Sequence, residues 1–79
     1  MDYRVELENL GLVSPQAAQL AQRVKEIDGA LQRGEITVQE RQFFLEQIRD
    51  VEAAEQLAGD ENALRLTVAV ISAGIAIFA

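Results

Sequence analysis

A chain of 79 residues can form one small domain, or one small domain with an appendage. Such chains bury a limited share of their surface, so they usually need disulfides, a metal or oligomerisation for stability. The sequence has no cysteine and no histidine, which removes disulfides, thiolate ligands and the commonest general base. Its 13 acidic and 7 basic residues give a net charge of −6, which disfavours binding to nucleic acid. We therefore expect a non-enzymatic protein with no cofactor, no metal site and no small-molecule substrate.

The first 33 residues predict two helices. Residues 3–10 form a short helix that ends at Gly11. Ser14 and Pro15 mark the start of a second helix over 15–33, because serine caps free amides and proline has no amide to lose.

Two further helices follow. Thr37 and Glu40 have the spacing of a capping box, in which each side chain satisfies an amide of the other residue's turn. This box predicts a third helix over 38–58. Asp60 is placed to cap a fourth helix over 61–79.

The second and third helices should form an antiparallel hairpin over 15–58, because only residues 34–37 link them. Apolar residues recur along both helices at steps of three and four, which indicates one buried stripe on each. The predicted hairpin core consists of Leu20, Val24, Ile27, Leu31, Ile36, Phe44, Ile48 and Val51. Two helices cannot cover this core alone, so a third element or a second copy must do so.

The segment Gly34-Glu35-Ile36-Thr37-Val38-Gln39-Glu40 resembles the G-x-I-T-x-x-E turn of SHOCT domains, which are short bacterial and phage helical hairpins. The resemblance covers residues 24–48, with Ile27 and Ile48 at apolar positions of the two helices. One departure is Arg41, where the family usually has phenylalanine; Phe43 or Phe44 could supply that contact. The resemblance implies an oligomerisation module, often found in proteins that also carry membrane segments, and it implies no catalysis.

The chain divides into an acidic body over 1–60 and an apolar segment over 61–79. All 20 charged residues lie in 1–65, and the last 14 residues carry none. Read as a helix, the segment has a bulky seam with heptad spacing, made of Leu64, Val68, Ile71, Ile75 and Phe78. A neighbouring stripe of small residues permits close helix packing and consists of Ala69, Ser72 and Ala76, with Arg65 and Ala79 at its ends.

This apolar segment has three interpretations. Its uncharged run would span about 21 Å as a helix, and 18 residues become available if Arg65 reaches back to the interface, which approaches the length of a membrane anchor. Alternatively, the helix is buried in a protein assembly. A β-strand is the third interpretation, because Val68, Val70, Ile75 and Ile77 are β-branched.

We therefore expect an all-α protein with a short N-terminal helix, a helical hairpin and a long apolar C-terminal helix. The expected function is structural: a self-associating hairpin fixed in a membrane by the last helix. The alternative is a minor subunit of a large assembly such as a phage virion, with that helix in a multimeric core. A holin-like pore former is a third possibility. The polar residues 2–6 predict no signal peptide.

Overall fold

The computed structural model describes residues 2–78, and every regular element in that range is helical. The all-α class is therefore confirmed, and the β-strand interpretation of the last segment is wrong. The elements in chain order are α1 (Tyr3–Leu10), α2 (Pro15–Gln32), α3 (Val38–Gln47), the π-helical segment η1 (Ile48–Glu52), α4 (Ala53–Gln56) and α5 (Glu61–Ala76).

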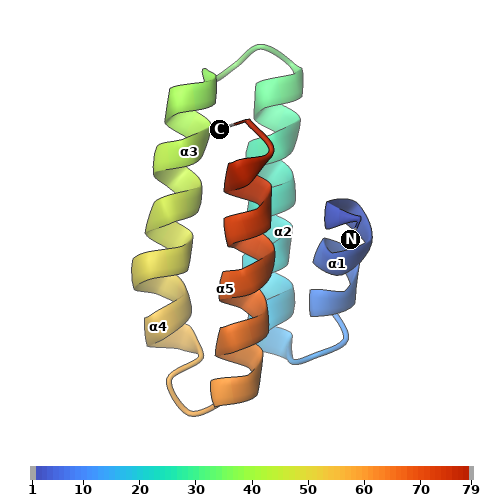
Figure 1. Ribbon diagram of the computed structural model, residues 1–79, viewed down its shortest axis with the longest axis vertical. Coiled ribbons are helices and arrows are strands. Elements are labelled where there is room, and N and C mark those ends of the chain that lie inside the picture. Colours follow the sequence, from blue (N-terminus) through green and yellow to red (C-terminus); the bar gives the residue numbers. More distant parts are fainter. Residues whose placement is uncertain (1, 79) are drawn as a thin grey trace.

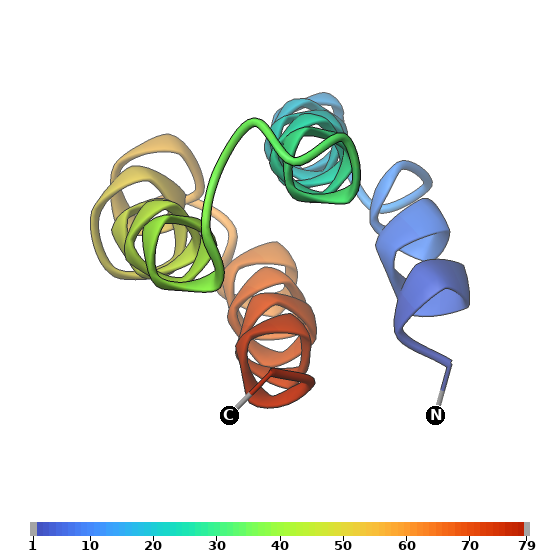
Figure 2. The ribbon, with the colours of Figure 1, turned by 90° about the horizontal axis from the view of Figure 1, so that it is seen from above.

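Four rods make up the molecule, because α3, η1 and α4 form one continuous helix (Figure 1). Seen from above, α2, the α3–α4 rod and α5 stand at the corners of a triangle, and α1 lies beside α2 and α5 (Figure 2). The space inside this triangle holds the buried apolar side chains. The last helix therefore packs within the same bundle as the acidic body.

Side-chain caps fix where the helices begin. Ser14 accepts a hydrogen bond from the Ala17 amide at 3.1 Å, and Asp60 accepts one from Ala63 at 3.0 Å. Both hydrogen bonds of the capping box are present, from the Glu40 amide to Thr37 and from the Thr37 amide to Glu40. Each cap satisfies amides that the first helical turn leaves without partners.

A glycine turn ends α2 and reverses the chain. Gly34 has a φ of +75°, a left-handed conformation that residues with a Cβ rarely adopt. The Glu35 amide donates to the Ala30 carbonyl at 2.9 Å, and the Gly34 amide donates to the Leu31 carbonyl at 3.0 Å. This pair of bonds is a Schellman motif, which satisfies the last carbonyls of the helix. The chain then enters α3 directly beside α2 (Figure 1).

The π-helical segment η1 changes which residues face the core. The Ala53 amide donates to the Ile48 carbonyl, five residues back, so one extra residue is accommodated in this turn. The buried positions along this rod are Arg41, Leu45, Ile48, Ala53 and Leu57, and the step from 48 to 53 is five residues.

Two predicted hairpin-core positions differ from the structure. Val51 is 48% exposed because the π-helical turn carries it away from the core. Phe44 is 37% exposed because the inward face of α3 runs through Arg41 and Leu45. Of the other predicted core residues, three are buried and three are half-buried; the buried ones are Leu20, Val24 and Ile48, and the half-buried ones are Ile27, Leu31 and Ile36.

The buried face of α5 also differs from the predicted seam. Its most buried residues are Ala63, Thr67, Val70, Ile71 and Gly74. Of the seam, only Ile71 belongs to this set; Leu64, Val68 and Ile75 are half-buried flanks and Phe78 is exposed. The prediction weighed bulky residues, whereas α5 lies among three neighbours and turns its small residues toward them.

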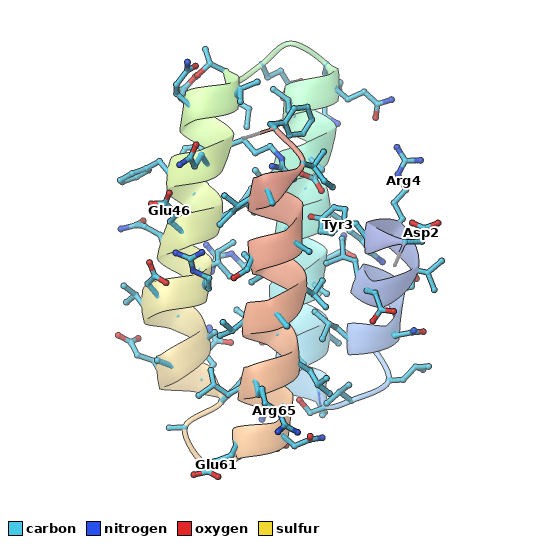
Figure 3. The ribbon with its side chains drawn as sticks, in the orientation of Figure 1. Asp2, Tyr3, Arg4, Glu46, Glu61 and Arg65 are labelled. Carbon is cyan, nitrogen blue, oxygen red and sulfur yellow. The ribbon has the colours of Figure 1, made fainter. Side chains whose placement is uncertain are left out.

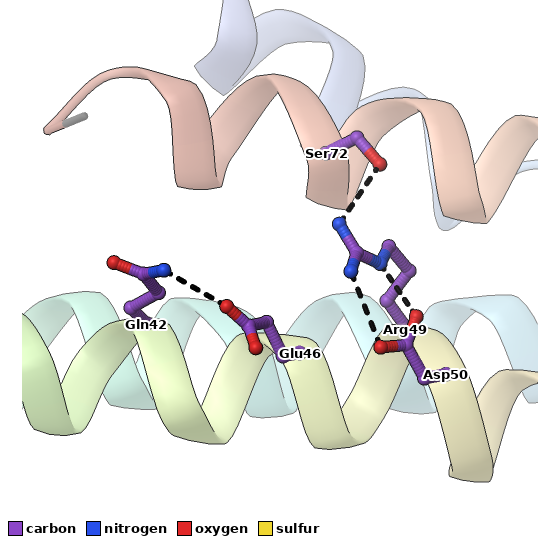
Figure 4. Close-up of polar contacts among 5 residues, drawn as sticks. All are labelled: Gln42, Glu46, Arg49, Asp50 and Ser72. Atoms are coloured by element: carbon purple, nitrogen blue, oxygen red, sulfur yellow. Dashed lines mark hydrogen bonds and ion pairs between the residues drawn. The ribbon is translucent and has the colours of Figure 1, made fainter.

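The predicted small-residue stripe is mostly at the surface. Ala69 and Ala76 are exposed, and Ser72 is half-buried. Figure 4 shows Ser72 facing the η1 segment, where Arg49 Nη1 approaches its hydroxyl at 3.5 Å while the same guanidinium holds Asp50. Nearby, Gln42 donates to Glu46 along α3 at 2.9 Å (Figure 4). Close packing of α5 thus runs along a different stripe from the predicted one.

Length and hydropathy bear on the membrane interpretation. The α5 helix has 16 residues, whereas a spanning helix needs about 20. No helix within residues 2–78 combines the length and the apolar character required to cross a bilayer.

Thr67 is the one buried side chain of residues 2–78 whose polar atom has no hydrogen-bond partner in the structure. It is fully buried, so its hydroxyl has lost water without compensation. We expect Thr67→Val, which keeps the shape and removes the hydroxyl, to stabilise the protein by about 1 kcal/mol. Urea unfolding followed by circular dichroism measures this change. Thr67→Ser is the control; it keeps the hydroxyl and should destabilise.

Candidate functional site

An apolar groove lies on the outer side of α2 and α3, where the helices meet beside the Gly34 turn. We call it the α2–α3 groove; its volume is about 320 Å³. The floor is apolar and the rim is polar. The floor residues are Ile27, Ala30, Ile36, Phe44 and Ile48, and the rim residues are Arg23, Glu26, Gln47 and Glu52.

Two aromatic rings extend the apolar surface at this groove. Phe43 and Phe44 pack edge to face with ring centroids 5.8 Å apart. Phe43 is 58% exposed and Phe44 37% exposed, so much of both rings is in contact with water. Large apolar groups that cluster at a surface mark contact sites more often than scattered ones do.

The charge at the groove is low for so acidic a chain. Arg23 on α2 forms an ion pair with Glu52 on η1 across it. Glu26 is the other charged lining residue, so the net charge of the lining is −1, compared with −6 for the whole chain. Both side chains of this ion pair are partly exposed, at 48% and 26%, so the pair adds little stability. Two copies that meet at the α2–α3 groove therefore repel each other less than two copies that meet at the more acidic parts of the surface.

A second cluster joins four helices near the start of α1. The Tyr3 hydroxyl donates to one carboxylate oxygen of Asp28 at 2.9 Å, and Arg41 Nε donates to the other at 2.7 Å. Arg41 Nη1 also donates to the carbonyl of Gly74 at 2.9 Å. The Arg41 side chain is only 2% exposed, and its guanidinium lies 4.8 Å from the centre of the Phe78 ring.

The geometry of this cluster explains Gly74 and the state of Tyr3. A Cβ at position 74 would lie 2.5 Å from the Tyr3 ring, so only glycine lets the ring lie against α5. Figure 3 shows Tyr3 turned from α1 toward the bundle. Burial, and then the charge of Asp28, raises the pKa of Tyr3 above its usual value. The phenol therefore stays protonated and remains a donor.

Part of these surfaces is visible in the sequence. The apolar pattern predicts Ile27, Ile36 and Phe44 inside the hairpin core, whereas they line the groove. Arg41 departs from the SHOCT pattern, and the sequence analysis makes no prediction of its burial. Its position four residues before Leu45 and seven before Ile48, on the apolar face of the helix, was the signal for a buried arginine.

Neither surface is a metal site. Within residues 2–78, no three His, Cys, Asp or Glu side chains are placed to hold a metal ion. Comparison with known proteins adds no assignment: no family model, no curated protein and no solved structure matches the chain. The function therefore has to be argued from the geometry.

Proposed function

We propose that this protein is a non-enzymatic assembly module that associates with a second copy of itself through the α2–α3 groove. The observation that carries the proposal is an exposed aromatic pair at the apolar groove, in which Phe44 belongs to the floor and the Phe43 ring packs against it. On the opposite side of the hairpin, α5 and α1 already cover the apolar residues. A second copy would cover the side that remains open.

A second copy fits the groove better than an unrelated partner of unknown charge. A two-fold contact places the same surface on both subunits, so the exposed Phe43 ring of each can pack against the partner's groove floor, which includes Phe44. The low net charge of the groove lining limits repulsion between the two copies, while most of the acidic surface stays apart. A chain of this length also gains stability by burying apolar surface in a dimer interface.

The membrane interpretation has less support than self-association. The residues that would face lipid in an anchor include Ile71 and Val70, and both are buried against other helices. Releasing α5 into a bilayer would expose the core of the remaining helices to water. The virion and pore interpretations have no observation here that favours them.

Sedimentation equilibrium of the purified full chain tests self-association. We expect a monomer–dimer equilibrium, and Phe44→Glu should weaken it by at least about tenfold because a carboxylate would enter an apolar contact. Leu12→Glu is the matched control. Leu12 is 86% exposed in the loop between α1 and α2, outside the groove lining, so the dimer constant should not change.

Three outcomes would count against the groove as the interface. They are a wild-type monomer at about 1 mM, equal association of wild type and Phe44→Glu, or a loss of association in Leu12→Glu alone. Flotation with anionic and neutral vesicles adds a separate check. Binding to vesicles by both wild type and Phe44→Glu, with no dimer in solution, would favour the anchor instead.

A further inference from the structure

A second cavity lies on another side of the bundle from the α2–α3 groove. It occupies about 700 Å³ between α1, the second half of α2 and the end of α5. Small-molecule sites in proteins have volumes of about 300–1,000 Å³. Its walls include the apolar side chains Leu7, Leu31, Ile77 and Phe78.

The polar lining of this cavity has the opposite charge to the protein. Three basic residues line it, Arg4, Lys25 and Arg41, together with two acidic residues, Glu8 and Asp28. The net charge of the lining is therefore +1, whereas the net charge of the whole chain is −6. Three of the seven basic residues therefore meet at one cavity. A positive cavity on an acidic protein favours an anion over a cation.

The five charged groups differ in how far they are neutralised. Arg41 is held by Asp28 at 2.7 Å, and Lys25 pairs with Glu8 at 2.6 Å. Arg4 forms no ion pair with any residue of 2–78. In Figure 3 its side chain extends beyond the first turn of α1, at the side of the cavity that it lines. The uncompensated charge of the cavity is therefore at Arg4.

Gly29 lines the cavity and contributes no side chain to its wall. It lies inside α2, where glycine is a poor helix former. A Cβ there would approach only the far end of the flexible Arg33 side chain, at 3.0 Å. Packing therefore explains Gly74, against the Tyr3 ring, but it does not explain Gly29. Because Gly29 lines the cavity, we expect a larger side chain at this position to reduce its volume.

From these observations we propose that the cavity binds a small organic acid with an aromatic or branched alkyl group. The apolar group would lie between Leu7, Leu31 and Phe78. The carboxylate would pair with Arg4 at the mouth. Arg41 and Asp28 hold the inner wall in place through Tyr3 and Gly74. This inference revises the expectation of no small-molecule ligand, and it does not depend on the dimer.

The test is titration of the ¹⁵N-labelled full chain with phenylacetate, followed by amide chemical shifts. Phenethylamine, which has the same ring and the opposite charge, is the ligand control. We expect saturable shifts at Leu7, Gly29 and Phe78 with a dissociation constant of about 1 mM or below for phenylacetate. Phenethylamine should bind at least about tenfold more weakly.

Two variants tie the binding to the cavity. Gly29→Leu should weaken phenylacetate binding at least about tenfold by filling the space, while helicity is kept because leucine is a good helix former. Arg4→Gln, at an exposed position that should not affect folding, should weaken it about fivefold by removing the free cation.

The proposal is overturned by any of three results. One is the absence of saturable shifts in wild type below about 10 mM phenylacetate. Another is equal affinity for phenethylamine, which would remove the preference for an anion. The last is wild-type affinity in both Gly29→Leu and Arg4→Gln, which would place the ligand elsewhere.

Discussion

Replacing Ile71 with aspartate is expected to unfold the protein. Ile71 is fully buried on α5, where it lies among the side chains of the central core. The change removes a large apolar side chain and places a carboxylate in the apolar core, at a cost of about 4 kcal/mol or more. Small domains have a total stability of about 5–15 kcal/mol, so little or none would remain.

Ala69→Asp is the matched control for this change. Ala69 lies two residues earlier on the same helix and is exposed, so its carboxylate would remain in water. We expect Ala69→Asp to keep the wild-type circular dichroism spectrum and to change the melting temperature little. Ile71→Asp should lose the helical signal and the cooperative transition across the whole chain.

The pair of substitutions separates a core helix from a membrane anchor. In an anchor, both positions would face lipid or a neighbouring span, and the hairpin over 15–58 would stay helical in either variant. Retention of cooperative unfolding by Ile71→Asp would therefore contradict the packing of α5 described above. For the same reason, we do not expect a chain truncated before Glu61 to fold on its own, because α5 covers the core of the remaining helices.

The helix starts and the C-terminal turn of α2 could be predicted because they depend on neighbouring residues. Ser14, Thr37, Glu40 and Asp60 make their caps within three residues, and the Gly34 turn needs only a left-handed glycine. Such contacts are visible as spacing in the sequence. The starts of α2, α3 and α5 and the end of α2 follow from them.

The buried faces were harder to predict because they depend on contacts between distant residues. Gly74 is close to Tyr3 only in the folded chain, and nothing in the local pattern marks it as a core position. The π-helical turn at η1 moves Val51 outward by adding one residue to the turn, which no regular period anticipates. Thr67 and Arg41 are polar residue types, and only the packing of distant helices shows that both are buried.

The ion pair between Arg41 and Asp28 should show an asymmetry between its partners. Arg41 is 2% exposed, whereas Asp28 is 29% exposed, so the two charges differ in their access to water. Removing the cation leaves a carboxylate that water and the Tyr3 hydroxyl can still solvate. Removing the carboxylate leaves a buried guanidinium with no opposite charge, which is the costlier state.

We therefore expect Asp28→Ala to cost about 3 kcal/mol and Arg41→Met only about 1–2 kcal/mol. Methionine preserves much of the arginine volume and can pack against the Phe78 ring. The double variant should cost less than the sum of the two, because the unpaired cation is no longer present. Urea unfolding of all four proteins provides the complete cycle.

The Arg49 and Asp50 pair supplies the matched control for this cycle. Their contact is as short, at 2.7 Å, but both side chains are far more exposed than Arg41, and Arg49 reaches its partner along one helix. Arg49→Met and Asp50→Ala should each cost less than about 1 kcal/mol and should combine almost additively. Equal costs for Arg41→Met and Asp28→Ala, or additivity in that cycle, would mean that the buried guanidinium is stabilised mainly by Gly74 and Phe78. The asymmetry would then have no basis in the exposure of the two charges.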